Sequence, residues 1–164
     1  MGSKKSKITE NINEGRESGR EGIEAGRKLE GEGKEIKQIL DSIDTSMDED
    51  DVAAVRAAET GYHGDFTSAA DEQIDPHVEK MNETEQGAID EATQEGDKTR
   101  EAAGKFEQME GVSEVGSSNA REGAEKMESS AEEYDSQVEQ ANQVIEEIES
   151  EAEQVKSDID STFS

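Results

Sequence analysis

The feature that most constrains this chain is a run of uncharged residues at alternating steps of four and three along its first quarter. This spacing follows one face of a helix and is typical of a helix that packs along its length against other helices. The sequence therefore predicts long packed helices. The positions are Ile8, Ile12, Gly15, Gly19, Gly22, Gly26, Leu29, Gly33, Ile36, Leu40, Ile43 and Met47.

Glycine occupies five of these positions, and it is the unusual part of the pattern. Each glycine inside a helix costs about 1 kcal/mol relative to alanine. Because glycine has no side chain, it lets a neighbouring helix, or its large side chains, come close. We expect large residues of segments 81–106 and 127–134 to fill this space in an up-down-up bundle. The expected helix-packing seam is Gly15, Gly19, Gly22, Gly26 and Gly33.

Composition restricts the core to a thin one. Only 29% of the 164 residues are hydrophobic, 3% are aromatic, and tryptophan is absent. A thin seam shared along rods needs fewer apolar residues than a globular core does. We predict an all-α fold: an elongated antiparallel bundle of three long helices plus a short helix, coiled-coil-like, in a single elongated domain spanning residues 1–164.

Changes in the apolar phase predict where the helices begin and end. Gly61 and Gly64 predict a sharp turn after the short helix, because glycine permits left-handed backbone. Pro76 is expected to disturb the helix that follows, and a loop rich in glycine and serine is expected at residues 111–119. The long helices are expected at about residues 7–44, 68–110 and 120–161, and the short helix at about residues 50–60.

The net charge of −27 restricts the partners. Such a chain repels the phosphates of nucleic acid and anionic membrane surfaces, so we expect neither as a partner. Low hydrophobicity with high charge is also the signature of disorder. Full disorder is disfavoured because the first seam keeps its phase for twelve positions. The expected partner is another helical protein, or further copies of this chain in a homo-oligomer.

No catalytic constellation is visible in the sequence. There is no cysteine, which excludes disulfides and thiolate sites. His63 and His77 are the only imidazoles, and this composition builds little concave apolar surface around them. There is also no phosphate-binding loop and no Glu-x-x-His pair. We therefore predict a protein that is not an enzyme and that binds no metal or cofactor.

The first residues, Met1-Gly2-Ser3-Lys4-Lys5-Ser6, fit the pattern for N-terminal myristoylation. One alternative is therefore a membrane-associated helical protein held by an acylated Gly2. No apolar run is long enough for a signal peptide or a membrane span. The expected location is the cytoplasm, or outside the cell after secretion without a cleavable signal peptide.

The segment Tyr62-His63-Gly64 resembles the hairpin turn of WXG-type proteins, small helical proteins that type VII secretion systems export. Tyrosine stands here in the place of the family's tryptophan. Phe106 and Glu110 match the family's export motif, an aromatic residue followed by an acid four positions later. The related LXG toxins and their helical partners share the long-rod build. The third long helix and the glycine seam depart from the family pattern.

This resemblance implies a non-enzymatic export substrate, or a targeting partner or chaperone, that pairs with another helical protein. The recognition surface that it implies consists of Tyr62, Gly64, Phe66, Phe106 and Glu110. A second hypothesis does not depend on the resemblance. Long seams in a constant phase are also typical of structural coiled coils, such as a scaffold component of a phage or a cell-surface assembly.

Overall fold

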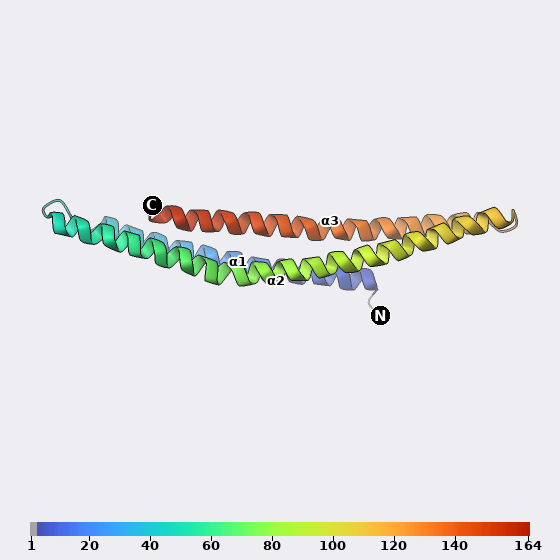
Figure 1. The fold of residues 1–164 in the computed structure, drawn as a ribbon, viewed down its shortest axis with the longest axis horizontal. Coiled ribbons are helices and arrows are strands. Elements are labelled where there is room, and N and C mark those ends of the chain that lie inside the picture. The colour runs from blue at the N-terminus through green and yellow to red at the C-terminus, as the bar shows by residue number, and fades with distance from the viewer. Residues whose placement is uncertain (1–2) are drawn as a thin grey trace. The chain divides into compact units, whose positions relative to one another are not determined.

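The computed structural model describes residues 3–164 as three long helices joined by two short loops (Figure 1). Helix α1 is Lys4–Asp41, α2 is Glu49–Val112 and α3 is Ser117–Thr162. Within residues 3–164 there is no strand. The predicted all-helical bundle is confirmed at this level. The proposed acylation of Gly2 lies outside the described residues.

Packing divides the chain into two compact units. The first unit contains the chain up to Gly15 together with Asn82–Ile145, and the second contains Arg16–Met81 and Glu146–Ser164. All three helices contribute a segment to each unit. The prediction of a single domain stays a prediction.

The expected short helix and the turn after it are wrong, because α2 continues through Gly61 and Gly64. A helix tolerates these two glycines at a cost of about 1 kcal/mol each. The continuous helix sets Tyr62 and Phe66 one turn apart on the same face, where both rings pack against Phe163. A turn at this point would separate the two rings. The contact of both rings with the buried Phe163 side chain therefore offsets the cost of the glycines.

The two loops carry the local signals that end and start helices. In the first loop, residues 42–48, the Asp48 carboxylate accepts a hydrogen bond from the backbone N–H of Asp50 at 2.9 Å and so caps α2. Asp44 accepts hydrogen bonds from the backbone and the hydroxyl of Ser46, which lower its pKa. In the second loop, Gly116 has a φ of 79°, a conformation that favours glycine.

The core of each unit is one thin layer between its helices. Pro76 lies inside α2 without ending it. In the second unit, the buried cluster consists of Ile23, Leu29, Ala70, Ile74, Ala152, Val155 and Ile159. In the first unit, buried alanines are frequent on α2 and α3. The buried hydrophobic residues there are Ile8, Ile12, Ala88, Ala92, Ala103, Ala120, Ala124, Ala131, Tyr134, Ala141 and Val144.

Candidate helix-pairing surface

A row of three buried glycines on α1 faces α3 in the second unit. Gly19, Gly26 and Gly33 are seven residues apart, so they lie on one line along the helix. A Cβ atom at Gly19 would lie 2.7 Å from Ile148 Cγ2, and one at Gly26 would lie 2.6 Å from Val155 Cγ1. Side chains of α3 thus occupy the space that the glycines leave. We call the surface formed by this row and the facing residues of α2 the α3 seat.

Gly22 brings α1 against α2 in the same unit. A Cβ atom there would lie 2.8 Å from His77 Cβ and 3.2 Å from the carbonyl oxygen of Ile74. Both atoms belong to, or attach directly to, the backbone of α2, so they cannot move without the helix. Gly22 is therefore a site where the two backbones approach closely, and any side chain would push them apart.

The segments that face these glycines differ from the expected ones. In the second unit, the glycines face residues 66–77 of α2, residues of α3 from 148 onward and Phe163 just after α3, and not segments 81–106 and 127–134. The physical reason is the position of the first loop. Because α2 begins at Glu49 and not near residue 68, the end of α1 lies beside the early part of α2. The segments of α2 and α3 that lie against the glycines therefore differ from the expected ones.

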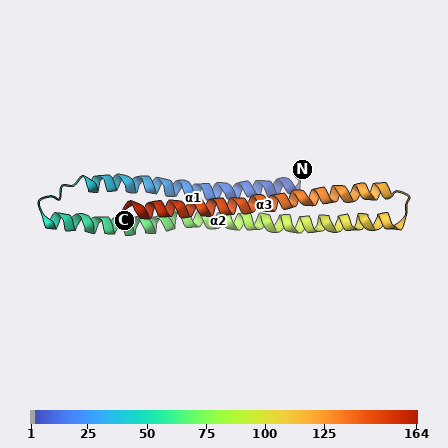
Figure 2. The ribbon, with the colours of Figure 1, turned by 90° about the horizontal axis from the view of Figure 1, so that it is seen from above.

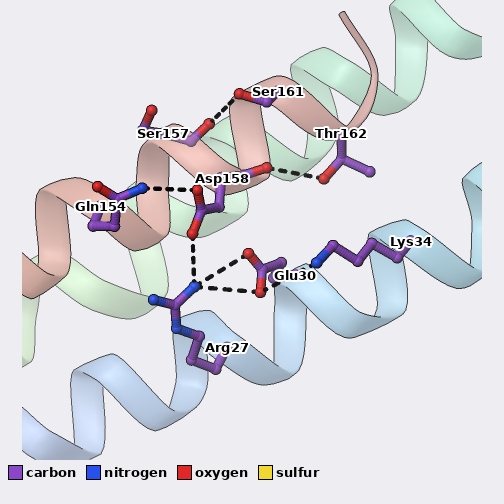
Figure 3. A network of polar contacts seen from close by, with 8 residues as sticks. All are labelled: Arg27, Glu30, Lys34, Gln154, Ser157, Asp158, Ser161 and Thr162. Atoms are coloured by element: carbon purple, nitrogen blue, oxygen red, sulfur yellow. Dashed lines mark hydrogen bonds and ion pairs between the residues drawn. The ribbon is translucent and has the colours of Figure 1, made fainter.

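An ion-pair network joins α1 to α3 (Figure 3). Arg27 Nη1 donates to Asp158 Oδ2 at 2.8 Å and to Glu30 Oε2 at 3.2 Å. Gln154 Nε2 donates to the other oxygen of Asp158 at 2.9 Å. The bond from Arg27, and secondly that from Gln154, lowers the pKa of Asp158. We call Arg27, Glu30, Gln154 and Asp158 the α1–α3 clamp. Exposed pairs of this kind add little stability, and their main effect is to fix the pairing.

An aromatic cluster closes the far end of the α3 seat. The Tyr62 and Phe163 rings are stacked with centroids 6.0 Å apart, and Phe66 lies 5.4 Å from Phe163. His63 Nε2 lies 2.7 Å from Asp160 Oδ1 on α3. Two residues of the implied recognition surface, Tyr62 and Phe66, thus hold the end of α3.

The other residues of the implied recognition surface are placed differently. Gly64 is exposed, and a Cβ there would meet no atom within 4 Å. Phe106 and Glu110 belong to the first unit, where they join α2 to α3. The Phe106 ring lies over Gly123, 2.5 Å from the position of a Cβ atom. Arg121 donates to Glu110 at 2.6 Å, which raises the pKa of Arg121.

The first unit also buries polar groups where α1 begins. The Glu85 side chain is fully buried, and its Cδ lies 2.9 Å from the position of a Cβ atom at Gly15. Gln137 Nε2 donates to the backbone carbonyl of Lys5 at 2.7 Å and to Thr9 Oγ1 at 3.0 Å. Gly15, the remaining glycine of the expected seam, thus lies against a carboxylate and not against an apolar side chain.

Three residues important for this packing were missed from the sequence. Phe163 follows Ile159 by four positions and continues the seam of α3 by one more step. Glu85 lies between the buried residues Met81 and Ala88 on α2, where a charged side chain gives no sign in the sequence that it is buried. Gly123 carries no signal of its own beyond its position beside Ala124, and its role depends on where Phe106 falls.

Within residues 3–164, no group of three or more His, Cys, Asp or Glu side chains is arranged to hold a metal ion. No helix in this range is both long and apolar enough to cross a membrane. Comparison with protein-family models, curated proteins and solved structures finds no match to this chain.

Proposed function

We propose that this protein is not an enzyme and acts by helix–helix pairing, through antiparallel, coiled-coil-like packing. The observation that carries the proposal is the glycine row Gly19, Gly26 and Gly33. Branched side chains of α3 and the Phe163 ring just after it pack directly onto the backbone of α1 at this row. Each glycine lowers the stability of the helix by about 1 kcal/mol relative to alanine, and in return the helix presents a surface against which another helix can pack closely.

The specific form of the proposal is a secreted protein, or a targeting partner or chaperone, of a type VII secretion system of the WXG/LXG kind. Support comes from Phe106 and Glu110, which keep the spacing of the export motif and lie one turn apart on α2. The segment Tyr62-His63-Gly64 gives no such support, because it is helical.

Secretion of the full chain from a bacterium with a type VII system tests this form. We expect Phe106→Ala and Glu110→Gln to abolish export while helix content by circular dichroism is retained. Glu107→Gln is the matched control, because Glu107 is an exposed acid on the same turn and its change should leave export intact. Normal export of both motif variants would contradict the secretion role.

Light scattering of the purified chain separates this proposal from the scaffold alternative. A monomer or a one-to-one complex with another helical protein agrees with a targeting role. A large homo-oligomer whose mass grows with concentration would instead assign the chain to a structural assembly.

A further inference from the structure

The pairing of α1 with α2 continues beyond the aromatic cluster that closes the α3 seat. Helix α3 ends at Thr162, and Phe163 lies over Gly33 at 3.4 Å from the position of a Cβ atom. Both α1 and α2 extend further, to Asp41 and back to Glu49. Figure 2 shows that the C-terminal end of α3 stops short of the loop between α1 and α2. At this end of the second unit only two helices pack together.

On α1, the row of glycines ends here and a large apolar residue takes the next position of the row. Leu40 follows Gly33 by seven residues, the spacing of the glycines that face α3. Beyond Phe163 lies a groove of about 360 Å³ between the two helices. We call it the end groove. Its apolar lining includes Leu40, Ile43, Ala54 and Val55.

Large apolar side chains at the end of α1 and in the first loop remain exposed, and one of them, Ile43, lines the groove. Ile43 is 46% exposed, Ile39 is 65% exposed and Met47 is 91% exposed. In contrast, the α1 seam upstream, from Ile23 to Leu29, is buried against the other helices. Exposed apolar residues that gather beside a groove mark an interaction site.

The charges around the groove select its occupant. Asp44 and Asp51 line the groove itself. The Lys37 ammonium is held by Glu59 at 3.0 Å and by Asp41 at 3.3 Å, so its charge is already balanced. The bond to Glu59, and secondly that to Asp41, raises the pKa of Lys37 against the lowering effect of burial. The loop and the start of α2 add further acids: Asp48, Glu49 and Asp50. A second copy of this chain, at −27, is repelled here, whereas a basic partner is attracted.

We propose that the end groove binds an amphipathic helix of another protein, with an apolar stripe flanked by lysine or arginine. The helix extends the line of α3 over about two to three turns, because residues 34–41 of α1 span about 12 Å. Its apolar stripe covers Ile43 and Val55, and its cations face Asp44 and Asp51. The inference rests on the proposed helix-pairing function and adds to it the location and the chemistry of the partner.

Fluorescence anisotropy of the full chain with a synthetic peptide tests this. The probe is a labelled helix of about 16 residues with leucines at helical spacing and lysines beside them. We expect it to bind the wild-type chain, and we expect the double variant Ile43→Ser, Val55→Ser to bind at least tenfold more weakly. The matched control is Val112→Ser, Val115→Ser, which removes two exposed valines near the other loop and should not change the affinity.

A peptide with glutamate in place of lysine serves as the charge control and is expected not to bind. Affinity for the lysine peptide should fall between about 50 mM and about 200 mM salt, because salt screens the acids of the groove. Thermal unfolding of each variant by circular dichroism checks that the bundle stays folded.

Equal affinity of the two double variants for the lysine peptide would overturn the proposal, as would no binding to the wild-type chain. A dimer of the chain that Ile43→Ser, Val55→Ser dissociates would also overturn it, since the occupant would then be a second copy. If the groove variants change nothing but Phe106→Ala still abolishes export, helix pairing stands and only the groove is refuted.

Discussion

Replacing Gly22 with alanine tests whether bare backbone on α1 is needed for packing, and Gly31 supplies the control. Alanine gains about 1 kcal/mol of helix propensity at either position. At Gly31, a Cβ meets no atom within 4 Å, so the full gain should appear as added stability. At Gly22, the added Cβ would lie 2.8 Å from His77 Cβ and 3.2 Å from the Ile74 carbonyl oxygen.

Contacts this short force α1 and α2 apart, since neither atom is the free end of a side chain. Overpacking of this kind costs about 1–3 kcal/mol. Gly22→Ala should therefore be between neutral and about 2 kcal/mol less stable than the wild-type chain, after the propensity gain of about 1 kcal/mol is included. The difference between Gly31→Ala and Gly22→Ala should equal the packing cost alone.

Urea unfolding of the full chain, followed by far-ultraviolet circular dichroism at one salt concentration, measures these differences. An unchanged dependence on urea concentration would show that only stability has changed. If Gly22→Ala gained as much stability as Gly31→Ala, α1 and α2 would not be in close contact at this position, and the argument for the glycine seam would fail.

Three further predictions concern α3 and the continuity of α2. Phe163→Ala should lower the free energy of unfolding by about 3 kcal/mol, because it removes a buried ring. Denaturant unfolding measures this difference, and an unchanged free energy of unfolding would mean that the Phe163 ring is exposed to solvent. Gly64→Ala should raise the free energy of unfolding by about 1 kcal/mol if α2 is continuous. A lower free energy of unfolding in the same measurement would indicate a turn at this position. Arg27→Gln should lower the melting temperature at neutral pH more than Arg16→Gln does. Because pairing with Arg27 lowers the pKa of Asp158, this pair stabilises the fold above pH 3.8, the ordinary pKa of Asp158, and the stabilisation is lost as pH falls through the folded pKa. The melting temperatures of Arg27→Gln and Arg16→Gln should therefore converge in acid. A difference between them that did not change with pH would contradict the pairing.

The inner face of α1 follows from spacing alone. Ile8, Ile12, Leu29 and Leu40 are buried as their phase predicts, whereas Ile43 and Met47, which follow the end of α1, are exposed. The phase is a local property, because each step depends only on the geometry of one helix. No long-range information is needed to find that face.

The continuity of α2 through Gly61 and Gly64 could not be found in this way. Two glycines around Tyr62 fit a turn and a helix equally well in local terms, and the choice depends on Phe163 at the other end of the chain. One signal was available: Tyr62, Phe66, Ala70 and Ile74 are four residues apart, so an apolar face runs through the supposed turn.

The candidate site was harder to predict than the fold. Spacing selects Gly19, Gly26 and Gly33 as inner-face residues, but it does not identify the side chains that cover them. That pairing depends on the position of a loop elsewhere in the sequence. A charged residue at a seam position, such as Glu85, is equally ambiguous, because the sequence does not show that Gly15 leaves room for it.

The clamp between α1 and α3 has a consequence for how the protein is made. Arg20 and Glu151, like Arg27 and Asp158, are separated by 131 residues. A ribosome adding about 5–20 residues per second takes roughly 7–26 s to complete that interval. Until α3 has been synthesised, the glycines of this segment have only α2 to pack against, and the helix propensity of the segment is poor. The face of α1 that α3 covers therefore remains accessible to chaperones and proteases until α3 has been synthesised.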